Sequence, residues 1–186
     1  MATTNIKKVL QDIEKKAKKM SWPIIGPEHG KILEKLIGER KPKRILEIGS
    51  LVGYSSILMS QYLPKSAKIT TIEINPKFAL LAQKNFKKAG VESLIEIITG
   101  DAMKVMPKLQ DNFDMLFLDA AKDECYNYIL LAENKLSPRV VVVADNVKIF
   151  ENDMQDYLDY VRNSGKYESE KFDFGADAME VSFKKN

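Results

Sequence analysis

Short apolar runs alternate with amphipathic stretches along most of the chain, and this alternation restricts the fold more than any other feature. The apolar runs cover residues 45–48, 68–74, 94–98, 113–118 and 139–144, and a helical pattern follows each of them. Strand–helix units in succession are typical of a parallel sheet because each helix carries the chain back across a face of the sheet. We therefore expect an α/β fold with a doubly wound, mostly parallel sheet.

The two ends of the chain extend this pattern. Residues 167–172 and 179–184 alternate like strands around a turn that contains Gly175, which predicts a C-terminal antiparallel hairpin and a seven-stranded sheet in total. Residues 5–19 and 27–39 have helical periodicity and predict extra N-terminal helices. We expect one domain over residues 1–186, with residues 1–40 as a helical cap.

Length and composition narrow the class of protein. A chain of 186 residues is large enough for one hydrophobic core. Its single cysteine, Cys125, excludes an internal disulfide and suits a reducing compartment. The lone His29 excludes a metal site built from several histidines. No apolar run is long enough for a membrane span and no signal peptide is evident, so we expect a cytoplasmic protein with no membrane partner.

A glycine turn follows the first apolar run. Residues 44–54 read Arg-Ile-Leu-Glu-Ile-Gly-Ser-Leu-Val-Gly-Tyr, which predicts a buried strand, a Gly49-x-x-x-Gly53 turn and a helix that starts near Tyr54. Glycines let a backbone pass close to a ligand, and a helix start offers free N–H groups. Glu47 is an acid inside an apolar strand and needs a partner there. The turn fits a nucleotide site, and it also fits an ordinary strand-to-helix connection.

Polar residues follow the other strands. Glu73, Asp101, Asp119 and the pair Asp145-Asn146 all lie where a predicted strand ends. Ligands of parallel sheets bind outside the carboxyl ends of the strands, although Asp and Asn at these places can also cap helices. Glu73 comes 24 residues after Gly49, close to the spacing of a ribose-binding acid.

A second group of residues has the chemistry of a cation site. Asp119, Asp145 and Asn146 offer hard oxygen donors, which suit Mg²⁺ or Ca²⁺. Lys122 follows Asp119 by three residues and can face the same site, where a nearby cation would favour its neutral, basic form. The alternative is a surface lysine paired with Asp123 or Glu124.

These motifs resemble the S-adenosylmethionine-dependent O-methyltransferases of the catechol and caffeoyl-CoA type, a Rossmann-like class. The resemblance runs from about residue 22 to 184. It is carried by residues 46–55 (Leu-Glu-Ile-Gly-Ser-Leu-Val-Gly-Tyr-Ser), 71–76 (Thr-Ile-Glu-Ile-Asn-Pro), 100–102 (Gly-Asp-Ala), 117–123 (Phe-Leu-Asp-Ala-Ala-Lys-Asp) and 144–147 (Ala-Asp-Asn-Val). The last two segments are the most specific.

The resemblance implies a role for each matched residue. It implies that the methionine part of the cofactor is lined by Glu47, Gly49, Gly53, Tyr54 and Ser55. It implies that Glu73, followed by Ile74, holds the ribose and that Asp101 and Ala102 flank the adenine. It implies a divalent cation, usually Mg²⁺, on Asp119, Asp145 and Asn146, with Asp119 also at the cofactor and Lys122 as the base. Glu180 matches, more loosely, an acid that contacts the acceptor.

The acceptor is less constrained. Ala120 and Ala121 stand where animal catechol enzymes have bulky residues, and no proline follows soon after Asn146, so we expect an open acceptor pocket. The first expectation is a small hydroxylated acceptor with neighbouring hydroxyls, such as a catechol. The second is a hydroxylated uridine in tRNA, which the lysine-rich first helix favours. An NAD-binding oxidoreductase is a third interpretation, which the Gly-x-x-x-Gly turn disfavours; a homodimer is a candidate assembly.

Overall fold

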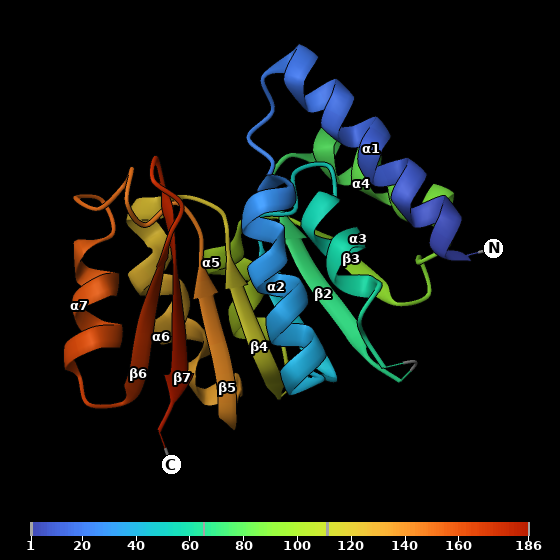
Figure 1. Ribbon diagram of the computed structural model, residues 1–186. Helices are drawn as coiled ribbons and strands as arrows, with labels where there is room; N and C mark the ends of the chain where they lie inside the picture. Colours follow the sequence, from blue (N-terminus) through green and yellow to red (C-terminus); the bar gives the residue numbers. More distant parts are fainter. Residues whose placement is uncertain (1, 65, 111, 186) are drawn as a thin grey trace.

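A seven-stranded sheet forms the centre of the computed structural model, which describes residues 2–64, 66–110 and 112–185 (Figure 1). The strand order is β3-β2-β1-β4-β5-β7-β6, and only the pairs that include β7 are antiparallel. The strands are β1 (Arg44–Ile48), β2 (Lys68–Glu73), β3 (Ile95–Thr99), β4 (Phe113–Leu118), β5 (Leu136–Ala144), β6 (Tyr167–Asp173) and β7 (Ala178–Lys184). The expected doubly wound, mostly parallel sheet with a terminal hairpin is confirmed.

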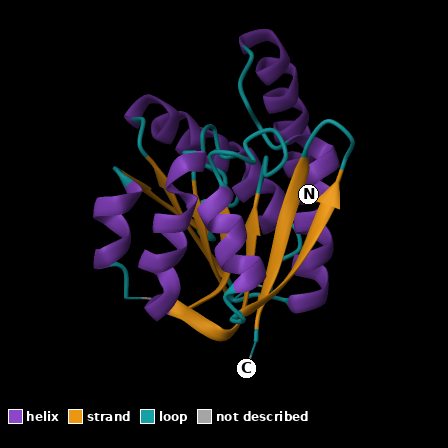
Figure 2. Ribbon diagram, turned by 90° about the vertical axis from the view of Figure 1, so that its left-hand side faces the viewer, coloured by secondary structure: helices purple, strands orange, loops and turns teal. Residues whose placement is uncertain are grey.

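Helices cover both faces of this sheet (Figure 2). They are α1 (Ala2–Met20), α2 (Gly26–Arg40), α3 (Tyr54–Ser60), α4 (Pro76–Ala89), α5 (Ala102–Val105), α6 (Cys125–Ala132) and α7 (Gln155–Asn163). Short 3₁₀ turns extend α5 and flank α6. None of the helices in the described ranges is long and apolar enough to cross a membrane.

Alternation along the strands creates two hydrophobic cores. Successive side chains of a strand point to opposite faces, so Ile45 joins the core under α1–α4 while Leu46 joins the core under α5–α7. Met115 and Leu116 divide in the same way on β4. All four side chains are buried. Because the strands are covered on both faces, they are almost continuously apolar, which explains the runs in the sequence.

Several boundaries differ from the sequence-based expectation, and the largest shifts lie around β5. Strand β5 begins at Leu136, three residues earlier than expected, because its pairing with β4 skips a segment that contains Pro138. The missing N–H of Pro138 therefore costs no ladder bond. Helix α6 is correspondingly shorter, and α7 begins at Gln155 after a series of turns.

The order of the strands gathers the polar ends. Strand β1 lies between β2 and β4, and β5 follows β4, so Gly49, Glu73, Asp119 and Asp145 all lie at the carboxyl edge of neighbouring strands. Helix α1 packs on α3 and α4, beside this edge (Figure 1). The assignment of residues 1–186 to one domain, with residues 1–40 as its helical cap, stays a prediction.

Gly53, directly before α3, allows α3 and α4 to pack closely against each other next to the site. Its φ is +82°, and a Cβ there would lie 2.4 Å from Cε1 of Phe86, a buried residue of α4. Gly90 also has a positive φ, +73°, but nothing lies within 4 Å of its Cβ position.

We expect Gly53→Ala to destabilise the protein more than Gly90→Ala. Both variants lose about 1–2 kcal/mol from the left-handed backbone. Only Gly53→Ala adds overpacking against Phe86, at about 1–3 kcal/mol. Urea unfolding of the two variants measures the difference, and equal losses of unfolding free energy would contradict the close packing.

Candidate active site

The β1–α3 turn passes so close to β4 that only glycine fits at its start. Gly49 has a φ of +93°, and a Cβ there would lie 2.4 Å from the carbonyl oxygen of Asp119. The Gly49 N–H donates to the carbonyl of Ile72 on β2, at 2.9 Å. These contacts bind the ends of three neighbouring strands together, and a cavity opens directly above them.

This cavity has a volume of about 380 Å³ and contains most of the residues expected at the cofactor. Eight of those residues line it. They are Gly49, Tyr54, Ser55, Glu73, Ile74, Asp101, Ala102 and Asp119. They come from the carboxyl ends of β1, β2, β3 and β4 and from the first turns of α3 and α5. The structure thus brings together residues that are up to 70 positions apart in the sequence.

Glu73 organises one wall of the cavity. It is the last residue of β2, and only 6% of it is exposed. One carboxylate oxygen accepts the backbone N–H of Leu51 at 2.7 Å, and the other accepts the N–H of Asn75 at 2.8 Å. The carboxylate is therefore fixed in place, and each oxygen has lone-pair capacity left for a ligand. Asp101 is likewise fixed, because its side chain caps α5 through the N–H of Met103.

Glu47 and Gly53 differ from expectation, since neither lines the cavity. Both oxygens of Glu47 accept hydrogen bonds from hydroxyls on the first turn of α3, those of Ser55 and Ser56. A carboxylate inside a strand has to find partners within the protein, and the nearest donors are these serines. Glu47 therefore attaches α3 to β1. Burial raises the pKa of Glu47 to about 7, although the two serine hydroxyls oppose the shift.

Asp119 connects the cavity to a second polar group. It follows β4 directly and lines the cavity, and its Oδ1 accepts a hydrogen bond from Lys122 Nζ at 2.9 Å. Burial raises the pKa of Asp119, and the Lys122 ammonium opposes that shift. Burial also disfavours the charge on Lys122, but Asp119 outweighs it and holds the pKa of Lys122 above its ordinary value. Lys122 faces Asp119 as expected and does not pair with Asp123 or Glu124.

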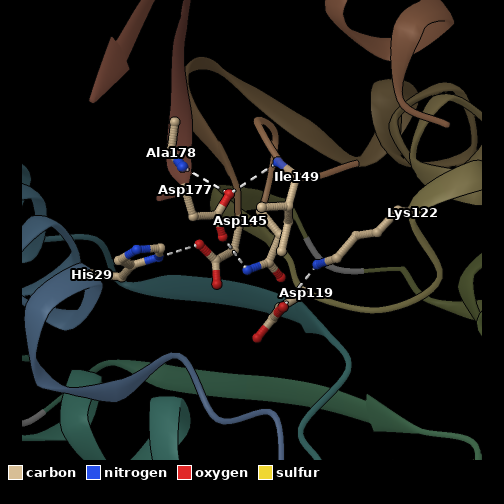
Figure 3. Close-up of polar contacts among 8 residues, drawn as sticks. His29, Asp119, Lys122, Asp145, Ile149, Asp177 and Ala178 are labelled. Atoms are coloured by element: carbon tan, nitrogen blue, oxygen red, sulfur yellow. Dashed lines mark hydrogen bonds and ion pairs between the residues drawn. The ribbon is translucent and has the colours of Figure 1, made fainter. Parts of the chain in front are cut away.

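Asp145, shown in Figure 3, and its neighbour in the sequence, Asn146, complete this group from the end of β5. Asp145 is buried, and its Oδ1 accepts a hydrogen bond from His29 Nδ1 at 2.6 Å. The amide of Asn146 donates to Asp177 Oδ2, also at 2.6 Å. Hydrogen bonding to Asp145 raises the pKa of His29, against the effect of burial. Three residues expected to hold a cation therefore lie on adjacent strand ends, with Lys122 beside them.

Glu180 lies elsewhere. It pairs with Ala144 across the β5–β7 ladder, is 1% exposed, and does not line the cavity. Its two oxygens accept hydrogen bonds from Arg162 on α7, at 2.8 and 2.7 Å. Each oxygen thus accepts one bond from the same guanidinium, the bidentate geometry that is frequent in Arg–carboxylate pairs. The structure does not bring Glu180 into the cavity with the other site residues. The geometry therefore does not support the expected contact between Glu180 and an acceptor.

Several site residues were missed from the sequence. Ile24 and Ile25 of the α1–α2 loop, together with Tyr128 of α6, form apolar walls of the cavity. His29 and Asp177 contact the acid group. The signal for His29 was its position near the start of a helix after a Pro-rich loop; Asp177, in a hairpin turn, carries no local signal.

Comparison with known proteins identifies the family. An O-methyltransferase family profile matches residues 2–174. A catechol O-methyltransferase of Niastella koreensis is 41% identical over 127 residues, which are 66% of this chain and 58% of that protein. The catechol O-methyltransferase of Mus musculus is 33% identical over 181 residues, 93% of this chain and 68% of that protein. The chain belongs to the O-methyltransferase family. It spans less than two thirds of the Niastella protein.

Solved structures agree with this fold. The O-methyltransferase TomG of Streptomyces achromogenes, solved in complex with SAM, has a TM-score of 0.84 and 27% identity, over 96% of this chain and 90% of that one. An O-methyltransferase from Bacillus cereus, solved with SAH, has a TM-score of 0.86 over 96% of this chain and 91% of that one. Its identity is 23%, so it supports the fold alone.

Stability should fall with rising pH because of Glu47. Its folded-state pKa of about 7 lies above the ordinary value of 4.5, so its contribution is complete below pH 4.5 and is lost as pH rises through 7. The shift corresponds to about 3 kcal/mol. The Glu47→Gln variant lacks this titrating group. The unfolding free energy of the variant minus that of wild type should therefore increase by about 3 kcal/mol between pH 4.5 and pH 8.

Urea unfolding in the presence of chelator measures this difference. Glu168→Gln, which changes an exposed carboxylate on β6, is the matched control and should not alter the profile. Parallel pH profiles for wild type and Glu47→Gln would show that folding does not change the pKa of Glu47, and would contradict the prediction.

Proposed function

We propose that the protein transfers a methyl group from S-adenosylmethionine to a hydroxyl of a metal-chelated, catechol-like or vicinal-diol acceptor. The observation that carries this proposal is the position of Asp119, which borders the cavity and also belongs to the group with Lys122, Asp145 and Asn146. A cofactor in the cavity and an acceptor held at that group would meet at this residue. The catechol O-methyltransferase relatives support the same chemistry.

The cavity suits the cofactor. Its volume of about 380 Å³ lies in the usual range for small-ligand sites, and its walls combine apolar side chains with a few fixed polar groups. Glu73 would accept hydrogen bonds from the ribose hydroxyls. Asp101 and Ala102 would flank the adenine, and Tyr54 and Ser55 would line the methionine end. Tyr54 is itself fixed, because its hydroxyl donates to Glu14 of α1 at 2.7 Å.

The acid group suits a divalent cation. Asp119, Asp145 and Asn146 supply hard oxygen ligands, the donor set that Mg²⁺ prefers. The charge of Asp145 adds to burial in raising the pKa of Asp119, which means that the two carboxylates repel each other. A bound cation would relieve that repulsion. When present, it would chelate two neighbouring hydroxyls of the acceptor and make one of them more acidic.

The residues of this chain then have separate tasks. A cation on Asp119 would offset the charge that raises the pKa of Lys122, and the neutral amine would then accept the proton of the reacting hydroxyl as general base. The cavity walls would keep the sulfonium methyl in line with the acceptor oxygen and away from water, which is a large part of the rate advantage. The new bond joins that oxygen to the methyl carbon, and the sulfur retains the electron pair of the broken carbon–sulfur bond. Ala120 and Ala121, which were expected on the acceptor side, line the cavity itself next to Asp119.

A tRNA acceptor is the second candidate. The exposed face of α1 carries several lysines, and α1 lies beside the site edge of the sheet (Figure 1). These lysines are Lys7, Lys8, Lys15, Lys16, Lys18 and Lys19. Such a face can bind phosphates, and hydroxylated uridine would then take the place of the small acceptor.

Methyl transfer from labelled S-adenosylmethionine tests the proposal. With Mg²⁺, we expect labelled product from a panel of catechols, loss of product in excess chelator, and recovery when Mg²⁺ is restored. Transfer that persists in chelator would contradict the metal assignment. Label only in tRNA containing hydroxylated uridine would favour the second candidate. Calorimetry that detects binding of NAD and no binding of S-adenosylmethionine would contradict the proposal and favour the oxidoreductase interpretation.

Lys122 should be essential as a base and not only as a charge. We expect Lys122→Arg to lower kcat by about 10²–10⁴, because a guanidinium keeps its proton in this pH range. Affinity for S-adenosylmethionine should change little, since Lys122 is not a lining residue of the cavity. Lys77→Arg, at an exposed position of α4, is the control. A wild-type kcat for Lys122→Arg would contradict the role of Lys122 as a base and would mean that the metal alone activates the hydroxyl.

A further inference from the structure

Two residues that the proposed reaction does not use contact the proposed metal ligands directly. His29, in the second turn of α2, donates from Nδ1 to Oδ1 of Asp145 at 2.6 Å. Asp177, in the β6–β7 turn, accepts from the amide of Asn146 at 2.6 Å. In Figure 3, Asp145 lies between His29 and Asp119, with Asp177 above it. Each contact uses one polar side-chain atom of a proposed ligand residue, and the other polar atom of that side chain stays available to a cation.

The chemistry of the partners determines which atoms are left. Asp177, as a carboxylate, can only accept, so Asn146 has to present its NH₂ group to Asp177 and keeps Oδ1. His29 occupies Oδ1 of Asp145, which keeps Oδ2. Among the described residues, no hydrogen bond engages either of these remaining oxygens. The contacts therefore leave a carboxylate oxygen and an amide oxygen for a cation.

Both partners are themselves held by surrounding structure. The ring of His29 stacks on Phe174, with 4.1 Å between the ring centroids and 21° between the planes. Asp177 Oδ1 accepts the backbone N–H of Ala178 at 2.8 Å, and the N–H of Phe174 donates to the carbonyl of Asp177 at 2.9 Å. Phe174 and Asp177 thus belong to one turn, and that turn positions both ligand residues.

Further contacts fix the turn and explain why the ligands need support. Lys148 Nζ donates to the Gly175 carbonyl at 2.6 Å and pairs with Asp173 at 3.0 Å. Asn146 has a φ of +62°, in the left-handed region, which a residue keeps only when its surroundings hold it there. The hydrogen bond from its side chain to Asp177 is such a restraint.

We propose that His29 and Asp177 are positioning residues that orient Asp145 and Asn146 toward the cation, so that the β6–β7 turn and α2 together set the metal affinity of the site. This inference rests on the proposed function, because it assumes a cation at Asp119, Asp145 and Asn146. Partners of this kind are commonly worth a 10–100-fold change in metal affinity.

Mn²⁺ binding to the full chain, followed by electron paramagnetic resonance, tests the inference without turnover. We expect His29→Ala and Asp177→Ala to weaken Mn²⁺ binding by about 10–100-fold. His29→Asn should stay near wild type, because its side-chain amide N–H can replace Nδ1–H. Asp153→Ala, which removes an exposed acid elsewhere, should bind Mn²⁺ like wild type. Calorimetry with S-adenosylmethionine should give unchanged affinity in all variants, since neither His29 nor Asp177 lines the cavity.

The outcomes separate this inference from the function it rests on. Wild-type protein that fails to bind Mn²⁺ would overturn the metal site and the positioning roles together. Tight binding by wild type, His29→Ala and Asp177→Ala alike would leave the metal site in place and overturn the positioning roles. A nitrogen coupling in the wild-type Mn²⁺ spectrum that disappears in His29→Ala would make His29 a ligand, and would also overturn its positioning role. Loss of S-adenosylmethionine binding in both alanine variants would indicate general damage and contradict a local effect.

Discussion

The close approach of Gly49 to the end of β4 is the contact on which the site depends. Because no Cβ fits between Gly49 and the Asp119 carbonyl, the β1–α3 turn lies directly against the residue that begins the acid group. Asp119 consequently forms part of the lining of the cavity above β1 and β2. A bulkier turn would push the two regions apart, and a methyl donor and an acceptor would no longer meet. The adjacency of β1, β4 and β5 in the sheet makes the contact available.

Buried charge is the second physical constraint. Glu47, Glu73 and Asp145 are buried at or below the same sheet edge, and Asp119 beside them is half-buried. Glu47 is satisfied by serine hydroxyls and Glu73 by backbone N–H groups, so these two acids need no counter-ion. Asp119 and Asp145 repel each other and share two basic partners, Lys122 and His29. This difference is consistent with structural and ligand-binding duties for the first two acids and with the proposed cation site at the second two.

The sequence was sufficient for the features that local chemistry determines. Continuous apolar runs located the parallel strands, and residues at their ends located the cavity and the Asp119–Asp145–Asn146 group. The start of β5 was misplaced because Pro138 reads as a strand breaker, whereas an irregular register accommodates it. The family resemblance implied that Glu47 lines the methionine part of the cofactor, whereas both of its oxygens have hydrogen-bond partners on the next helix. His29 and Asp177 are 148 positions apart, and only tertiary contacts bring them to the same two ligand residues.

A crystal of the full chain grown with Mn²⁺ and S-adenosylhomocysteine tests the central claim most directly. Anomalous scattering locates the metal independently of any refined side-chain position. We predict one anomalous peak in direct contact with oxygens of Asp119, Asp145 and Asn146. The homocysteine sulfur should lie in the cavity and face that peak, and the adenosine ribose should lie on Glu73. An anomalous peak at other residues, no peak under saturating Mn²⁺, or a nucleoside bound outside the cavity would contradict it.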